Sequence, residues 1–426
     1  MDFSMDIRLH TMANGVRVIT EKVPGVRSCS LGIWIGTGSR MEQEGEQGIT
    51  HFIEHLLFKG TETRSAKAIA EALDSVGGQL NAFTAKEMTC YYARVMAEHL
   101  PLAVDVLTDM LFHSTFEDEF LEKERNVIKE EISMYEDTPD ELIHDVFLMA
   151  AWPDNPLGAP ILGTADSLDR IDRAMIQRYI KRQYVPEHIV IACAGCLEHE
   201  QVLALVGPAF EALQMAERPA LAPAPAALSG KDIHVANDIG QVQICLGTRG
   251  ISAPDERNYP LYVLNGILGS GLSSRLVQTI REDRGLAYST YSFNSAFSDA
   301  GIFALCAGTS PQTADLVVSL FNQEMESIKK DGITKEELMK AKEQVRGGLF
   351  MGLESVGSRM NRLGRNLLLL DRIISPETTM EKVDSVVQDD IPPLAEYLFA
   401  EPHVLATIGP PEGSEGEDGD EEVGEA

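Results

Sequence analysis

A proline- and alanine-rich run near the middle of the chain separates two stretches in which strands and helices are expected in a similar order. The run, residues 217–229, reads ERPALAPAPAALS, a composition typical of a linker. On its N-terminal side, hydrophobic periodicity and turn residues predict strands at 16–22, 29–37, 79–84, 88–96 and 188–194. The same criteria predict helices at 47–58, 65–76, 97–113, 117–135, 140–151, 170–182 and 198–214.

The order of strands and helices recurs after the linker. Strands are expected at 241–247, 287–296, 301–308 and 403–408. Helices are expected at 256–268, 273–283, 311–329 and 334–350, with a largely helical stretch at 357–400. Such a recurrence is typical of a duplicated α+β unit, a weak internal repeat. We therefore expect domains at 1–216 and 231–410, a linker at 217–230 and an acidic, disordered tail at 411–426.

The segment His51-Phe-Ile-Glu54-His55 carries the residues that point most directly to chemistry. On a helix, His51 and His55 lie one turn apart on the same face, so both imidazoles can reach one metal ion. Glu54 flanks that face, close enough to touch a water at the metal without being a ligand. This is the H-x-x-E-H order, the inverse of the better-known H-E-x-x-H.

The surroundings of the motif distinguish a metal site from the alternative, a surface helix with two solvated histidines. The motif lies within GITHFIEHLLFKGT at 48–61, where apolar residues surround the polar trio, so the helix should be largely buried. Its counterpart in the second half, YPLYVLNGILG at 259–269, has neither a histidine nor a carboxylate. Only the first half is therefore expected to hold the metal.

A catalytic zinc ion takes three protein ligands and leaves one position for water. The two histidines leave one ligand to find, and the helix expected at 120–136, FLEKERNVIKEEISMYE, is the richest source of carboxylates downstream. Its Glu124 and Glu131 lie two turns apart on the same face. The pattern alone leaves five candidates open: Glu122, Glu124, Glu130, Glu131 and Glu136.

The charge balance argues against nucleic acid as a partner. With 36 basic and 66 acidic residues the formal net charge is −30, which opposes binding to phosphates. An acidic body attracts basic peptides by long-range steering, although the charge serves solubility equally well. The N-terminal residues MDFSMDIRLH contain no apolar run, and no stretch is apolar enough for a membrane span, so we expect a cytoplasmic protein.

Six cysteines are scattered along the chain, which does not suggest a disulfide framework. Cys193 and Cys196, with His199 nearby, raise the competing hypothesis of a second metal site or a redox site. No second cysteine pair completes a zinc set, so we expect buried, reduced thiols instead.

Several stretches together resemble the M16, or pitrilysin-like, family of zinc metallopeptidases in its short bacterial form, which is similar to mitochondrial processing peptidase. They lie within residues 8–408: NGVRVITE at 14–21, GSRMEQEGEQGITHFIEHLLFKGT at 38–61, GGQLNAFTAKEMTCYYA at 77–93, EKERNVIKEEISMYEDTPDE at 122–141, LGTADSL at 162–168 and GSGLSSRLVQTIREDRGLAYS at 269–289. The resemblance implies two homologous α/β-sandwich domains of the LuxS/processing-peptidase-like type. Each would be an antiparallel sheet with helices on one face, and together they would form a half-shell.

The resemblance also implies roles for individual residues. It places the third zinc ligand on Glu131, with one zinc ion per chain, and a supporting carboxylate on Glu124. Glu54 would serve as the general base of an endopeptidase. Arg281 and Tyr288 would contact the substrate near the scissile bond, where a guanidinium fork and a phenol are apt donors to a polarised carbonyl oxygen. Without the resemblance, Arg281 is more simply explained as a surface charge.

An edge strand is expected just before the middle of the first half. Residues 80–84, LNAFT, follow two glycines and could bind a peptide as an added strand, although an ordinary strand fits equally well. In the family the matching strand pairs with the peptide, so Asn81, Ala82 and Phe83 are expected to contact substrate.

The family further implies that two half-shells enclose a chamber. We therefore expect a homodimer in which Arg281 and Tyr288 act in trans, with unfolded peptides or presequence-like segments as substrates. The alternative is a non-catalytic assembly subunit, like the processing-peptidase-like core subunits of the respiratory chain. Such subunits usually lose metal ligands, whereas this chain keeps all of them.

Overall fold

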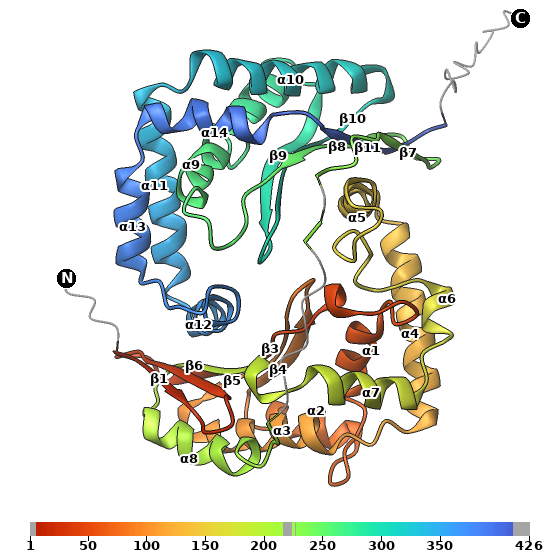
Figure 1. The fold of residues 1–426 in the computed structure, drawn as a ribbon, viewed down its shortest axis with the longest axis vertical. Helices are drawn as coiled ribbons and strands as arrows, with labels where there is room; N and C mark the ends of the chain where they lie inside the picture. The colour runs from red at the N-terminus through yellow and green to blue at the C-terminus, as the bar shows by residue number, and fades with distance from the viewer. Residues whose placement is uncertain (1–5, 216–223, 226, 412–426) are drawn as a thin grey trace, which may run out of the picture.

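The computed structural model describes residues 6–215, 224–225 and 227–411 (Figure 1). Most of the expected linker at 217–230, and almost all of the expected tail at 411–426, lie outside these residues. The described residues form two sheets, one from each half of the chain, with helices packed around them. The predicted α+β class is therefore confirmed.

The first sheet has six strands in the order β1-β2-β6-β3-β5-β4. Their bounds are β1 (Asp6–Thr11), β2 (Arg17–Lys22), β6 (Ile189–Gly195), β3 (Ser28–Ile35), β5 (Thr89–Met96) and β4 (Gln79–Thr84). The second sheet has five strands in the order β7-β11-β8-β10-β9. Their bounds are β7 (Ile233–Ala236), β11 (Val404–Gly409), β8 (Val242–Arg249), β10 (Gly301–Thr309) and β9 (Ala287–Ala296). Pairing is antiparallel as expected, except for one parallel pair in each sheet, β2–β6 and β7–β11.

Helices precede and follow the strands in both halves. Those of the first half are α1 (Ile49–Leu56), α2 (Ala66–Asp74), α3 (Leu100–His113), α4 (Asp118–Glu136), α5 (Pro139–Ala151), α6 (Ala165–Leu168), α7 (Arg173–Gln183) and α8 (His199–Phe210). Those of the second half are α9 (Asn258–Leu268), α10 (Ala314–Asp331), α11 (Lys335–Gly352), α12 (Val356–Leu370), α13 (Pro376–Ser385) and α14 (Ile391–Leu398). Among the described residues, no helix combines the length and the apolar character needed to cross a membrane.

Helices cover both faces of each sheet, because the two halves exchange one helix. The first sheet packs one face on helices of its own half, while Trp34 of β3 and its neighbours on the other face meet α12 of the second half. Reciprocally, Phe147 of α5 and its neighbours pack on one face of the second sheet. Figure 1 shows α12 beside the first sheet and α5 beside β7 and β11. The expectation of helices on one face only holds within each half but not for the assembled chain.

The packing of α12 on β3 is unusually close. A Cβ atom on Gly364 of α12 would lie 2.3 Å from the Cε2 atom of Trp34, and one on Gly32 of β3 would lie 2.5 Å from the Sδ atom of Met360. Only hydrogen at these two positions lets the helix approach the sheet so closely. The two glycines therefore help to fix how the halves sit together.

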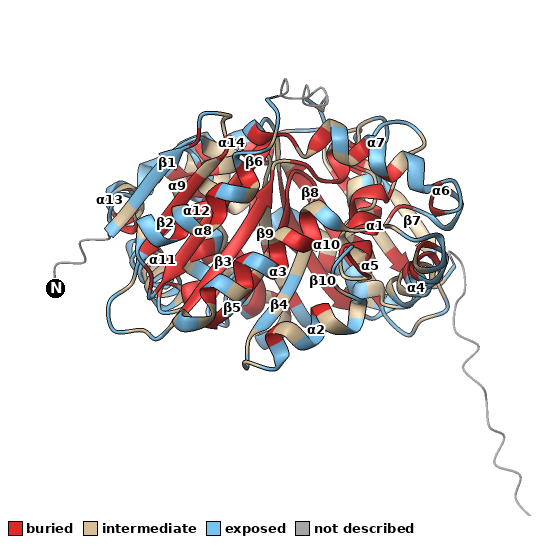
Figure 2. Cartoon of the chain, turned by 90° about the horizontal axis from the view of Figure 1, so that it is seen from below, coloured by how far each residue is buried: buried red, intermediate tan, exposed pale blue. Residues whose placement is uncertain are grey.

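Most expected elements are present, but three short ones were not predicted: β1, β7 and α6. Strand β1 lies at the edge of its sheet and is largely exposed (Figure 2). Its alternation of apolar and polar residues rests on Ile7 and Leu9 alone, which is too short to predict a strand. The helix expected at 273–283 is correct in place but is π-helical over Val277–Glu282.

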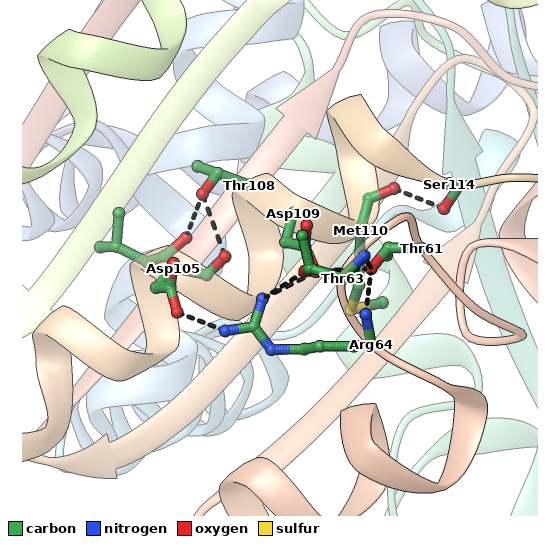
Figure 3. A network of polar contacts seen from close by, with 9 residues as sticks. Thr61, Thr63, Arg64, Asp105, Thr108, Asp109, Met110 and Ser114 are labelled. Atoms are coloured by element: carbon green, nitrogen blue, oxygen red, sulfur yellow. Dashed lines mark hydrogen bonds and ion pairs between the residues drawn. The ribbon is translucent and has the colours of Figure 1, made fainter.

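The loop that follows α1 is held against α3 by a buried carboxylate. Asp109 of α3 accepts hydrogen bonds from Thr61 at 2.7 Å, Thr63 at 2.9 Å and the Arg64 guanidinium at 2.7 Å (Figure 3). Arg64 also pairs with Asp105, one turn earlier on α3. These contacts fix the segment that connects α1 to α2.

Candidate metal centre

Helix α1 places the histidines of the motif side by side. Its apolar residues Ile49, Phe52, Ile53 and Leu56 are buried in the core of the first half, which leaves His51 and His55 on the face toward α4. The two imidazole rings lie 4.6 Å apart between centroids. The predicted helix and its buried setting are therefore both present.

The start of α1 is held by a buried carboxylate, Glu42, that no sequence motif indicates. Glu42 accepts the backbone N–H groups of Gly48 and Thr50, both at 2.9 Å. Gly48 has φ of +88°, a left-handed conformation that favours glycine. Burial raises the pKa of Glu42 to about 8, although the hydrogen bonds from Thr50 and Gly48 oppose the shift.

Glu131 of α4 completes a cluster with the two histidines. The Nε2 atom of His55 lies 3.5 Å from one carboxylate oxygen of Glu131, and the Nε2 atom of His51 lies 4.0 Å from the other. One donor atom from each of the three residues lies within 4.8 Å of the others. In the described part of the chain, no other group of histidine, cysteine and carboxylate side chains meets this criterion.

The donor set fits a zinc ion. Tetrahedral zinc with bonds of roughly 2.0–2.2 Å places its ligand atoms about 3.4 Å apart, close to the observed separations between the imidazoles and the carboxylate. Burial, together with a smaller effect of the neighbouring His55, lowers the pKa of His51 to about 4. His51 is therefore neutral at pH 7, the form that can donate a lone pair to a metal.

Two more side chains orient His55. Its Nδ1 atom lies 3.2 Å from a carboxylate oxygen of Glu124, and the other oxygen of Glu124 accepts from the Lys59 ammonium at 2.9 Å. An N–H group on Nδ1 that donates to Glu124 leaves the lone pair of His55 on Nε2, the atom that faces Glu131. Glu124 thus lies where the supporting carboxylate was expected, whereas Lys59 was not predicted.

Glu54 lies beside the cluster and contacts the end of strand β4. The Thr84 hydroxyl donates to Glu54 at 2.5 Å. Burial raises the pKa of Glu54, partly offset by this hydrogen bond. A carboxylate with a raised pKa, next to the cluster, is suited to accept and return a proton.

Strand β4 is an edge strand, as expected, because β5 is the one strand that pairs with it in the described part of the chain. Its Asn81 is exposed, Ala82 is partly buried, and the Phe83 ring packs edge-on against Trp34 at 5.5 Å. Among the described residues, no other strand pairs with the outer edge of β4. Contact of Asn81, Ala82 and Phe83 with a substrate stays a prediction.

Arg281 and Tyr288 of the second half lie together but apart from the cluster. The Arg281 guanidinium stacks 5.1 Å from the centre of the Tyr288 ring, which is 81% exposed. Among the described residues, neither forms a hydrogen bond or an ion pair with His51, His55 or Glu131. Tyr288 also lines a cavity of about 460 Å³ together with Asp140 and Ile143 near α5.

The cysteines do not form a second cluster. All six are free thiols, and five are buried as expected. Cys196 is exposed, because it lies in the turn that follows strand β6, so the expectation of a buried thiol is wrong for this residue.

Comparison with known families covers both halves of the chain. Residues 17–165 match the family model described as Insulinase (Peptidase family M16), and residues 170–345 match the model described as Peptidase M16 inactive domain. The chain belongs to peptidase family M16. The cluster of His51, His55 and Glu131 lies within the first M16 match, and the Arg281–Tyr288 pair lies within the second.

Individual M16 relatives agree along nearly the whole length. The uncharacterized zinc protease YmxG of Bacillus subtilis is 42% identical over 409 residues, which cover 95% of this chain and 98% of the relative. An uncharacterized zinc protease of Streptomyces coelicolor is 41% identical over 411 residues, which cover 95% of this chain and 90% of the relative.

Solved structures share the M16 fold. A structure titled peptidase M16 inactive domain from Pseudomonas fluorescens superposes with a TM-score of 0.89 at 20% identity, covering 95% of this chain and 98% of that one. A protease from Helicobacter pylori superposes with a TM-score of 0.87 at 22% identity, covering 95% of this chain and all of that one. The two-sheet architecture is therefore that of M16 proteins.

Proposed function

We propose that the chain is a zinc-dependent endopeptidase that hydrolyses unfolded peptides. The observation that carries the proposal is the convergence of His51, His55 and Glu131 within 4.8 Å, with Glu54 beside them. Membership of family M16 and relatives named zinc proteases support it. One zinc ion per chain is proposed, because the described residues contain one such cluster.

Each residue of the centre has a separate task in this proposal. His51, His55 and Glu131 would hold the ion, while Glu124 and Lys59 keep His55 in the tautomer that can bind. A bound zinc ion supplies Lewis acidity, which polarises a carbonyl group and lowers the pKa of water. Glu54 accepts a proton from the attacking water and returns it to the leaving nitrogen.

The substrate would pair with the outer edge of β4, adding a strand through main-chain hydrogen bonds that tolerate many sequences. Because Thr84 at the end of β4 contacts Glu54, this pairing would bring a peptide bond close to the base. Peptides of basic character would suit the net charge of −30. Asn81, Ala82 and Phe83 are the residues along which the peptide would lie.

We further propose a homodimer in which Arg281 and Tyr288 of one copy donate to the scissile carbonyl held by the other copy. Among the described residues, no hydrogen bond or ion pair joins Arg281 or Tyr288 to the cluster of the same chain, which supports an arrangement in trans. Mixing a Glu54→Gln chain with a Tyr288→Phe chain should then restore part of the activity. A mixture as inactive as both parents would contradict it.

Neighbouring glutamates on α4 allow a matched test of the metal centre. Glu131→Gln removes the ligand, whereas Glu130→Gln makes the same change on an exposed position one residue away. Zinc content by mass spectrometry and cleavage of a peptide library, with and without chelator, are measured for both. We expect Glu131→Gln to lose both zinc and cleavage, and Glu130→Gln to keep both.

Two outcomes would reject the proposal. If Glu131→Gln kept its zinc, the ligand set would be wrong. If the wild-type chain bound zinc but cleaved no peptide, the alternative of a non-catalytic assembly subunit would be favoured. The completeness of the cluster is what now weighs against that alternative.

A further inference from the structure

The turn between β9 and β10 of the second half packs against two buried charged residues of the first half, Arg40 and Glu87. Asp299 accepts two hydrogen bonds from the Arg40 guanidinium, at 2.7 and 2.8 Å. Ser298 donates its backbone N–H and its hydroxyl to the Glu87 carboxylate, at 2.8 and 2.6 Å. The hairpin that carries this turn extends from the second sheet toward the first half (Figure 1). The four residues thus form a polar joint between the halves.

The joint buries charged groups, and these are stable only when each of them keeps its partners. The Arg40 side chain is fully buried, Glu87 is buried, and the two also pair directly at 2.5 Å. A buried guanidinium needs carboxylate partners. Of the two carboxylates that pair with Arg40 here, Asp299 belongs to the turn of the second half and Glu87 accepts hydrogen bonds from Ser298 of the same turn. The position of the β9–β10 turn therefore determines how the side chains of Arg40 and Glu87 are held.

From Arg40, contacts lead to the metal-binding helix. Arg40 belongs to a short 3-10 turn, η1 (Ser39–Met41), and Glu42 directly follows it. Glu42 accepts the backbone N–H groups of Gly48 and Thr50, which begin α1 and precede His51. Arg40, which binds the second half, and Glu42, which holds the start of the metal-binding helix, are thus two positions apart.

From Glu87, contacts lead to the proposed base. Glu87 lies in the connection between β4 and β5, and Thr84 at the other end of this connection donates to Glu54. Backbone hydrogen bonds join the same connection to η1, from Ser39 to Ala85 at 3.2 Å and from Arg40 to Lys86 at 2.8 Å. A Cβ atom on Gly38 would lie 2.0 Å from the carbonyl oxygen of Ala85, so the two backbone segments are in close contact at this point.

We propose that Ser298 and Asp299 are positioning residues for the metal centre of the other half. They hold Arg40 and Glu87, and through these the start of α1 and the carboxylate of Glu54. The inference rests on the proposed function for its effect on catalysis. Its structural part, coupling between the β9–β10 turn and α1, does not require activity or a bound ion.

A matched pair of aspartates tests the coupling. Asp299→Asn weakens the joint, and Asp255→Asn is the control, because Asp255 also pairs with an arginine at 2.7 Å, and its side chain is 27% exposed against 29% for Asp299. Asp255 and its partner Arg257 both belong to the second half. Ser298→Ala, which removes one hydroxyl, is a milder variant that keeps the test open if Asp299→Asn folds poorly.

The first measurement is hydrogen exchange of the metal-free protein. Asp299→Asn and Ser298→Ala should speed exchange at the amides of Gly48 and Thr50 while leaving the amides of α8 unchanged. A merely structural loss of stability would speed exchange in both places. Asp255→Asn should change neither.

The second measurement is steady-state cleavage by the zinc-loaded protein. Both joint variants should lower kcat by about 10- to 100-fold with KM unchanged, because the base and the helix are displaced slightly while peptide binding persists. Exchange and kcat equal to those of Asp255→Asn would overturn the coupling. A wild-type chain that cleaves nothing would instead reject the proposed function, and the exchange experiment would still decide the coupling.

Discussion

Glu124 and Lys59 form a charged pair on the Nδ1 side of His55, whereas Glu131 lies on its Nε2 side. The ammonium of Lys59 keeps one oxygen of Glu124 occupied at 2.9 Å, and the other oxygen faces Nδ1 of His55 at 3.2 Å. Such a partner fixes the orientation of an imidazole ligand and raises its basicity. In the proposed zinc site, the pair would therefore influence the metal through His55 without being a ligand itself.

We predict that Glu124→Gln weakens zinc binding by about 10- to 100-fold, because a neutral amide polarises His55 less than a carboxylate does. Titration against a chromophoric chelator measures the affinity. Glu122→Gln is the control, since Glu122 lies on the same helix, is exposed and pairs with Arg125 instead. Equal affinities of the two variants would show that Glu124 does not support the ligand.

The sequence predicts those residues of the centre that are close to one another along the chain. His51, Glu54 and His55 share one helix, so their spacing alone places them together. Glu131 lies on α4, and the pattern left it among five glutamates; only the family resemblance selected it. Lys59 and Thr84 were missed because their contacts with Glu124 and Glu54 depend on tertiary packing, which no short spacing encodes.

Among the elements, the loop between α1 and α2 depends on one carboxylate. Burial by itself would raise the pKa of Asp109, but hydrogen bonds from Thr61, Arg64 and Thr63 outweigh it, and the pKa lies below its ordinary value of 3.8. The folded chain therefore holds the ionised form better than the unfolded chain does. This stabilisation is present above pH 3.8 and is lost as the pH falls through the lower folded pKa.

Asp109→Asn should accordingly lower the free energy of unfolding at neutral pH by about 1 to 3 kcal/mol, since several hydrogen bonds to a charge are weakened. The difference from wild type should shrink as the pH falls below 3.8. Urea unfolding across this range measures both effects. Asp105→Asn removes the exposed partner of the same arginine and should cost less than about 1 kcal/mol. A loss for Asp109→Asn that is independent of pH would contradict this account.

Which elements could be predicted follows from how they are buried. Strand β6 is a continuous apolar run, and β3 and β8 are mostly apolar and buried. The long helices carry one apolar face, so the positions of these elements are predicted to within a few residues. Strand β1 is exposed along most of its length, and β7 has only four residues. Each alternates apolar and polar residues over only a few positions, which is too short a pattern to distinguish a strand from a loop. The parallel pairing of β2 with β6 joins distant segments and has no local signal.

For the molecule as a whole, the exchange of α5 and α12 makes each half depend on the other for the covering of one sheet face. The sequence predicted two similar units in succession but gave no sign of this exchange, because an apolar helix face does not specify which sheet it covers. The domain boundaries at 1–216 and 231–410 stay a prediction, and along them neither unit would have both sheet faces covered. We therefore expect the halves to unfold together.

The two tryptophans of the chain allow this expectation to be tested, because Trp34 reports on α12 against the first sheet and Trp152, at the end of α5, packs on Phe297 of the second half. In a Trp152→Phe variant, whose tryptophan fluorescence comes from Trp34 alone, the urea transition of that fluorescence should coincide with the transition of the α5 amides followed by hydrogen exchange in the same protein. Gly364→Ala should lower the free energy of unfolding by about 1 to 3 kcal/mol through overpacking against Trp34, and should shift both transitions equally. Gly357 lies in the same helix, and a Cβ atom added there would lie 3.5 Å from the Ser355 hydroxyl, which is ordinary contact. Gly357→Ala should therefore be neutral or stabilising by up to about 1 kcal/mol. If Gly364→Ala shifted only the Trp34 signal, the halves would fold separately and α12 would be a detachable cover of the first sheet.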